Sequence, residues 1–281
     1  MVDFASLRAA MVEDQIAGRG ICAESVLAAL RKVPREAFLP AAVAEFAYED
    51  SPLPIDAGQT ISQPFIVALM TEALDLKGGG RVLEIGTGSG YAAAVLGEIA
   101  AEIYTVERVK ELADKAASTL AALGYRNVHV MLGDGTLGWQ AAAPYDAIVV
   151  TAGGPDVPPS LKQQLKVGGR LVMPVGTNPR VQELVRVTRT TNDSFISENI
   201  GNVRFVPLIG QEGWTPEEPK PAPARRARPA EAALVRSTSA AATGLDAIGS
   251  ADRDALLTRI GDAEPFETAE IEGCPIPIRL A

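Results

Sequence analysis

The feature that most constrains this chain is a short apolar strand that runs into a glycine-rich turn and then into a helix. Residues 82–90 read Val-Leu-Glu-Ile-Gly-Thr-Gly-Ser-Gly, and residues 91–100 have helical spacing of apolar side chains. Glycines at such a junction let the backbone approach a ligand closely, and ligands of open α/β sheets bind beyond the carboxyl ends of the strands. A tight turn without a ligand is the alternative, and three alternating glycines disfavour it. The pattern therefore predicts a ligand-binding loop.

Strands and helices alternate along the first 214 residues. Short apolar runs predict strands at 81–86, 102–107, 128–133, 145–152 and 168–175. Helical spacing predicts helices at 4–16, 23–32, 64–76, 91–100 and 108–123, with Pro64 as a first helical residue and Gly124 as a stop. Segments 181–190 and 194–206 resemble an antiparallel pair. The chain is thus expected to be α/β, a doubly wound and mostly parallel sheet with antiparallel strands at one edge.

The composition changes abruptly after Trp214. Residues 215–230 contain five prolines and no large apolar side chain, so this stretch cannot bury enough surface to offset its chain entropy. We therefore expect a globular domain over 1–214 that includes the N-terminal helices, and a Pro/Ala-rich linker over 215–250. A short, partly helical C-terminal extension is expected over 251–281.

The charge balance excludes several functions. With 26 basic and 35 acidic residues, the formal net charge is −9, which argues against binding nucleic acid or anionic lipid through phosphate neutralisation. No apolar run reaches the roughly 18 residues of a transmembrane helix, and the charged N-terminus lacks the apolar centre of a secretory signal. One histidine and two distant cysteines, Cys22 and Cys274, leave no metal-site pattern. We expect a cytoplasmic monomer without a metal.

The ligand of the glycine loop can be inferred from three successive strand ends. A dinucleotide fingerprint needs a third glycine where this chain has Tyr91. Glu107 ends the second strand, where a carboxylate can accept hydrogen bonds from two ribose hydroxyls, and Asp134 follows the third strand, where it could face an adenine amino group. Singly, such acids are more often helix caps or solvated groups. Together with the loop they suggest S-adenosylmethionine, whose cationic sulfonium suits an acidic protein.

Longer motifs resemble one family over about residues 5–214. The chain is similar to the protein-L-isoaspartate O-methyltransferases in the segments VPREAFLP (33–40), LPIDAGQTISQP (53–64), VLEIGTGSGY (82–91), TVER (105–108), GDG (133–135), PYDAIVVTA (144–152), GGRLVMPVG (168–176) and VRFVPL (203–208). The glycine loop alone would indicate only a methyltransferase. GQTISQP and VRFVPL, in this order and spacing, are much more discriminating.

The resemblance implies a repair activity. Methyl would pass from S-adenosylmethionine to the α-carboxylate of L-isoaspartyl residues in damaged proteins, the partners expected here. Ser62 would be the active-site residue, positioning the carboxylate with its hydroxyl. The implied substrate-binding residues are Thr60, Ser62, Arg204, Phe205 and Val206. The expected cofactor-binding residues are Ile61, Gln63, Glu84, Gly86, Thr87, Gly88, Ser89, Gly90, Glu107, Asp134 and Gly135.

Without the family resemblance, the residues themselves leave other functions open. A methyltransferase for another carboxylate would share the glycine loop, and a non-catalytic nucleotide- or protein-binding module could keep it for structure. Without the resemblance, Ser62 would be a turn or capping residue before Pro64, and 203–208 a core edge strand. His129 is expected to be a core or surface residue rather than a catalytic one.

Overall fold

The computed structural model describes residues 2–178 and 181–215. Its centre is a seven-stranded sheet in the order β5-β4-β3-β6-β7-β8-β9. The strands are β3 (Arg81–Ile85), β4 (Glu102–Glu107), β5 (Val128–Leu132), β6 (Tyr145–Val150), β7 (Leu165–Asn178), β8 (Val181–Arg189) and β9 (Phe195–Val203). The first five strands pair in parallel, whereas β8 and β9 add antiparallel pairs at one edge. The predicted fold class is confirmed.

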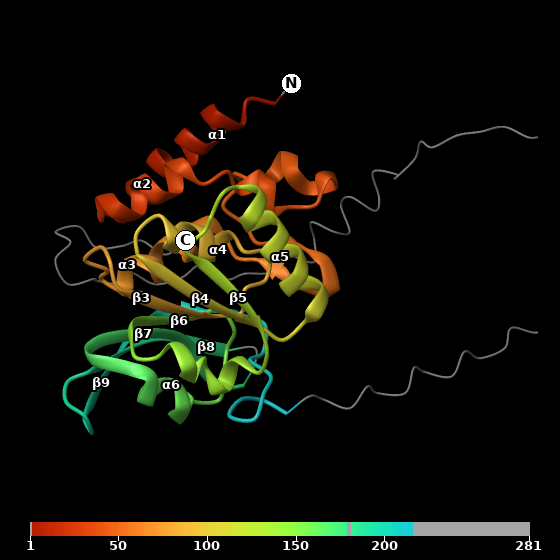
Figure 1. Cartoon of the computed structure of the whole chain (residues 1–281). Coiled ribbons are helices and arrows are strands. Elements are labelled where there is room, and N and C mark those ends of the chain that lie inside the picture. Colours follow the sequence, from red (N-terminus) through yellow and green to blue (C-terminus); the bar gives the residue numbers. More distant parts are fainter. Residues whose placement is uncertain (1, 179–180, 216–281) are drawn as a thin grey trace, which may run out of the picture. The chain divides into compact units, whose positions relative to one another are not determined.

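The sheet is covered on both faces because its central strands are apolar on both faces. Val82 and Val149 belong to one hydrophobic core, and their neighbours Leu83 and Val150 belong to a second core. This alternation follows from the period of two along a strand. Figure 1 shows α2 to α5 on one side of the sheet and α6 on the other.

The helices are α1 (Phe4–Ala10), α2 (Glu24–Lys32), α3 (Pro64–Ala73), α4 (Tyr91–Gly97), α5 (Lys110–Ala122) and α6 (Pro159–Gln164). As predicted, α3 begins at Pro64, and the backbone turns left-handed at Gly124 beyond α5. The helix expected over 4–16 is instead α-helical only to Ala10, and a π-helical turn follows over Met11–Ile16. Apolar spacing cannot separate these two helix types.

A two-stranded hairpin lies outside the main sheet and leads into α3. Its strands are β1 (Leu53–Pro54) and β2 (Thr60–Ile61), which pair antiparallel. Ser62 and Gln63 therefore form the link between β2 and α3. The linker and extension expected after residue 214 lie, apart from Thr215, outside the described residues.

Candidate active site

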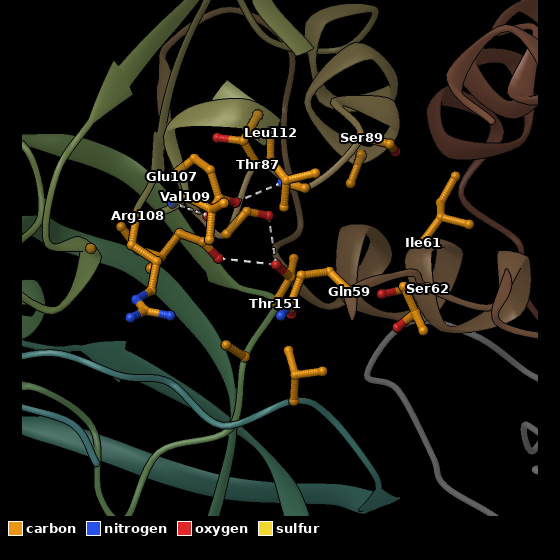
Figure 2. A pocket seen from close by; sticks show the side chains of 18 of the residues that line it. Gln59, Ile61, Ser62, Thr87, Ser89, Glu107, Arg108, Val109, Leu112 and Thr151 are labelled. Atoms are coloured by element: carbon orange, nitrogen blue, oxygen red, sulfur yellow. Dashed lines mark hydrogen bonds between the residues drawn. The ribbon is translucent and has the colours of Figure 1, made fainter. Parts of the chain in front are cut away.

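A cavity of about 350 Å³ lies at the carboxyl ends of β3, β4 and β6. These strands flank the point where the strand order reverses, which is where open α/β sheets bind ligands. Figure 2 shows Ser62 and Gln59 on one side of the cavity and Glu107 and Arg108 on the other. Its volume lies within the range of small-molecule sites, roughly 300–1,000 Å³.

The glycine loop forms the floor of this cavity. Gly86 has a φ of +95°, and a Cβ there would lie 2.4 Å from Thr151 Oγ1. The Thr151 hydroxyl in turn donates to the Gly86 carbonyl at 2.8 Å. The ends of β3 and β6 thus approach so closely that only glycine fits at residue 86.

Glu107 ties the loop to the end of β4. Its two carboxylate oxygens accept hydrogen bonds from the backbone N–H groups of Gly88 and Val109, both at 2.9 Å, and the residue is 6% exposed. Each carboxylate oxygen has a further lone pair. Glu107 lines the cavity, so these lone pairs are available to hydroxyl groups of a ligand.

Glu84 lies below the loop rather than in the cavity. It is fully buried, and its Oε2 lies 2.5 Å from the Thr105 hydroxyl, which is 2.6 Å from the hydroxyl of Thr87. Burial raises the pKa of Glu84 to about 8; the Thr105 hydroxyl opposes this shift, and the negative charge of Glu107 adds to it. Glu84 therefore supports the cavity residue Thr87 through Thr105.

Ser62 lines the cavity from the β2–α3 link. Among the described residues its hydroxyl has no hydrogen-bond partner, and the first free N–H of α3, that of Phe65, is bonded to the side chain of Asp50 instead. The alternative role as a capping residue is therefore not the one seen. The Gln63 side chain instead points to Asp50, with Nε2 donating to Oδ2 at 2.7 Å.

The structure brings most of the predicted site residues together. Those that line the cavity are Thr60, Ile61, Ser62, Gly86, Thr87, Gly88, Ser89, Glu107, Gly135 and Val206. Those outside the lining are Gln63, Glu84, Gly90, Asp134, Arg204 and Phe205. His129 is also outside it and pairs with Glu102 at 2.6 Å.

The residues outside the lining have other contacts. The Asp134 carboxylate accepts hydrogen bonds from the N–H groups of Thr136, at 2.9 Å, and Gln211, at 2.8 Å. Gly90 is the left-handed cap of α4. The main-chain N–H and carbonyl of Phe205 are both bonded to the Gln182 side chain, which leaves less of this segment free for a peptide than expected.

Sequence reasoning missed several lining residues: Gln59, Arg108, Val109, Leu112, Thr151, Leu208 and Ile209. Arg108 and Val109 directly follow Glu107, and Thr151 directly follows β6. The rule that ligands bind beyond strand ends could have found these three.

The cavity fits S-adenosylmethionine on its own chemistry. It combines a glycine loop that admits close backbone approach with the buried carboxylate of Glu107 and apolar walls that include Ile85 and Leu112. Within 2–178 and 181–215, no three His, Cys, Asp or Glu side chains are grouped to hold a metal ion. In the same ranges, no helix is both long and apolar enough to cross a membrane.

A doubly wound sheet with a glycine loop and a strand-end glutamate in one cavity is typical of enzymes that bind an adenosine-containing cofactor. Comparisons with known proteins place the chain among the S-adenosylmethionine-dependent methyltransferases. The sequence model of one such family, protein-L-isoaspartate (D-aspartate) O-methyltransferase, matches residues 6–213. The chain belongs to this family. The fold, enzyme class, cofactor and repair function expected from the sequence are confirmed.

Relatives with high identity carry the same description. A protein-L-isoaspartate O-methyltransferase of Rhodopseudomonas palustris is 66% identical over 209 residues, which cover 74% of this chain and 96% of that protein. Protein-L-isoaspartate O-methyltransferase 2 of Pelobacter propionicus is 61% identical over 207 residues, covering 74% of this chain and 92% of that protein.

Two solved structures are also similar. A protein-L-isoaspartate O-methyltransferase superimposes with a TM-score of 0.64 at 30% identity, covering 74% of this chain and 66% of that one. A Plasmodium falciparum protein described as a putative member, in complex with S-adenosyl-L-homocysteine, has a TM-score of 0.63 at 24% identity. The match covers 74% of this chain and 99% of that one, and it supports the shared fold.

Proposed function

We propose that this cavity holds S-adenosylmethionine together with the α-carboxylate of an L-isoaspartyl residue, and that Ser62 orients the carboxylate. The observation that carries the proposal is the position of Ser62: its hydroxyl, without a partner among the described residues, lines the same cavity as the glycine loop and Glu107. Methyl transfer to an isoaspartyl peptide and not to its aspartyl counterpart tests the proposal.

The reaction needs little from the protein beyond orientation. The bound cofactor supplies an electrophilic methyl group on a sulfonium. A carboxylate is already ionised at neutral pH, because its reference pKa lies near 3 to 4, so no general base is required. The hydroxyl of Ser62 donates one hydrogen bond to the carboxylate, and the cavity walls exclude water. Alignment of this kind can lower a barrier by roughly 7–11 kcal/mol in favourable cases.

The proposed cofactor contacts divide between the loop and the strand ends. Gly86, Thr87, Gly88, Ser89 and Gly135 would lie against the cofactor, as would Ile61, and Glu107 would accept hydrogen bonds from its ribose. Gly90, Gln63 and Glu84 lie outside the lining, so they would support the residues that contact the cofactor rather than contact it themselves. Asp134 would have to share its carboxylate between a ligand and its partners Thr136 and Gln211.

The peptide substrate would approach from the Thr60 and Val206 sides of the cavity, since both residues line it. Arg204 is exposed, and its main-chain groups have no hydrogen-bond partner in the described part of the chain, so they could pair with an extended peptide. Phe205 would contribute its side chain. Recognition through main-chain groups suits an enzyme that must accept many flanking sequences.

We also propose the cytoplasm as the compartment and a monomer as the working form. Two cysteines, far apart in the sequence, are typical of a reducing compartment, and one chain supplies a complete cavity lining. The family match over 6–213 supports a methyltransferase domain over 1–214. The linker (215–250) and the extension (251–281) remain proposals from composition.

A Ser62→Ala variant is expected to lose turnover but not cofactor binding. Removing the hydroxyl loosens the carboxylate in the transition state, and we expect kcat to fall roughly 10- to 100-fold. The Kd for S-adenosyl-L-homocysteine, measured by isothermal titration calorimetry, should stay at the wild-type value. Ser51→Ala, a serine of the preceding loop outside the cavity lining, is the matched control. Equal losses in kcat and Kd would refute the role of Ser62.

A further inference from the structure

The motif VPREAFLP contributes nothing to the cavity lining, yet it contains a fully buried arginine. Arg35 begins the 3-10 turn Arg35–Phe38 and is 0% exposed. Arginine is almost never fully buried unless its charge is compensated, because removing a guanidinium from water is costly. A buried cation this close to a reaction site therefore needs an explanation.

The guanidinium of Arg35 joins three separate parts of the chain. Its Nε donates to the carbonyl of Ala47 at 2.8 Å, and its Nη2 donates to the carbonyl of Ser62 at 2.8 Å. Its central carbon lies 4.8 Å from the centre of the Tyr91 ring, at the start of α4. The planar fork of arginine makes both carbonyl bonds at once, which the single nitrogen of lysine does not reproduce.

The carboxylate of Asp50 holds the residues that follow Ser62. Asp50 accepts hydrogen bonds from Gln63 Nε2 at 2.7 Å and from the Phe65 N–H at 3.0 Å, and it also pairs with Arg19. The guanidinium of Arg19 lies 3.6 Å from the Phe65 ring centre. The β2–α3 link is thus held at the Ser62 carbonyl and at the Gln63 side chain. The first turn of α3 is held at the Phe65 N–H.

These contacts hold the Ser62 carbonyl but not its hydroxyl. The Ser62 carbonyl is bound to Arg35, whereas the Ser62 side chain is among those that line the cavity (Figure 2). The orientation of the hydroxyl depends on the backbone of residue 62, because a serine side chain has only one torsion between its backbone and its oxygen. Anchoring the carbonyl therefore limits where the hydroxyl can point.

We propose that Arg35 is a positioning residue for methyl transfer, holding the Ser62 carbonyl so that the hydroxyl faces the substrate carboxylate. The inference rests on the role proposed above for Ser62. Arg35 itself does not line the cavity, although Ser62 and Tyr91, which it contacts, do. Loss of Arg35 should therefore lower kcat through Ser62. Cofactor affinity, which we assign to Glu107 and the glycine loop, should stay unchanged.

Arg35→Lys tests the proposal in the full chain. We expect kcat toward an isoaspartyl peptide to fall roughly 10- to 100-fold, the effect of a small misplacement of a reacting group. The peptide KM and the calorimetric Kd for S-adenosyl-L-homocysteine should stay within about threefold of wild type, a change of less than 1 kcal/mol. If the lysine variant does not fold, Arg35→Gln, which leaves no buried charge, serves the same test.

Arg8→Lys is the matched control. Arg8 is a half-buried arginine of the N-terminal region, and it bonds to Tyr48 and Glu36 rather than to Ser62. We expect its kcat to equal that of the wild type. An equal loss of kcat in Arg8→Lys would show a general loosening of the N-terminal helices and would overturn the proposal.

The double variant Arg35→Lys/Ser62→Ala separates this proposal from that for Ser62. If Arg35 acts through Ser62, the lysine substitution costs little further kcat once the hydroxyl is gone. An undiminished loss in that background would overturn the role of Arg35 while leaving that of Ser62 intact. A single Ser62→Ala variant with wild-type kcat would refute the role of Ser62 itself.

Discussion

A Glu107→Ala variant is expected to bind S-adenosylmethionine at least roughly 100-fold more weakly than the wild-type protein. Two hydrogen bonds from ribose hydroxyls to an ionised carboxylate are worth about 1.5–3 kcal/mol each, and 3 kcal/mol corresponds to a Kd ratio of about 150. The same substitution removes the acceptors of the Gly88 and Val109 N–H groups, which loosens the glycine loop. Both effects lower the affinity.

Isothermal titration with S-adenosylmethionine and with S-adenosyl-L-homocysteine measures this loss. Glu111→Ala, in the first turn of α5, removes an exposed glutamate that is close in sequence and controls for net charge. Its Kd should match that of the wild type. A Glu107→Ala variant that is folded and binds within threefold of wild type would exclude Glu107 as the ribose-binding residue.

The second large effect is a pH-dependent instability caused by Glu84. With a folded-state pKa of about 8 against 4.5 for the ordinary side chain, Glu84 keeps its proton in the folded protein where the unfolded chain has lost it. The unfolded state then binds fewer protons, so the free energy of unfolding falls as pH rises from about 4.5 to 8. The expected slope is about 1.4 kcal/mol per pH unit.

Glu84→Gln removes this ionisation while keeping the shape and hydrogen-bonding capacity of the protonated acid. We expect the glutamine variant and the wild type to have similar free energies of unfolding near pH 4, where Glu84 is protonated in both the folded and the unfolded state, and the variant to become progressively more stable toward pH 8. Urea unfolding of the ligand-free proteins across this range measures the difference, with Glu111→Gln as the exposed control. Parallel pH profiles for wild type and Glu84→Gln would contradict the raised pKa.

The fold was predictable where short-range patterns determine it. The apolar run before Gly86 predicted β3, and Pro64 predicted the start of α3. The helix α6 was not predicted, because its six residues are too few to show helical periodicity, although Pro159 starts it. Strand β7 begins earlier than expected, at Leu165, and runs to Asn178, since the pairing with β6 and β8 extends it.

The site was predictable only in part, because much of it depends on tertiary contacts. Gly86 and Glu107 follow from the rule that ligands bind at strand ends. Gln59 and Ile209 reach the cavity from segments far apart in the sequence, and no local pattern marks them. The burial of Arg35 is equally invisible in a sequence, since a charged residue in VPREAFLP is by default expected at the surface.

The central claim is that this cavity methylates isoaspartyl carboxylates. The most direct measurement incubates the full chain with methyl-labelled S-adenosylmethionine and two peptides that differ only in an L-isoaspartyl or L-aspartyl linkage. The same reactions with Glu107→Ala tie the labelling to this cavity. We predict base-labile label in the isoaspartyl peptide alone, with the label strongly reduced in the variant. Labelling of both peptides, or of neither, would contradict the account.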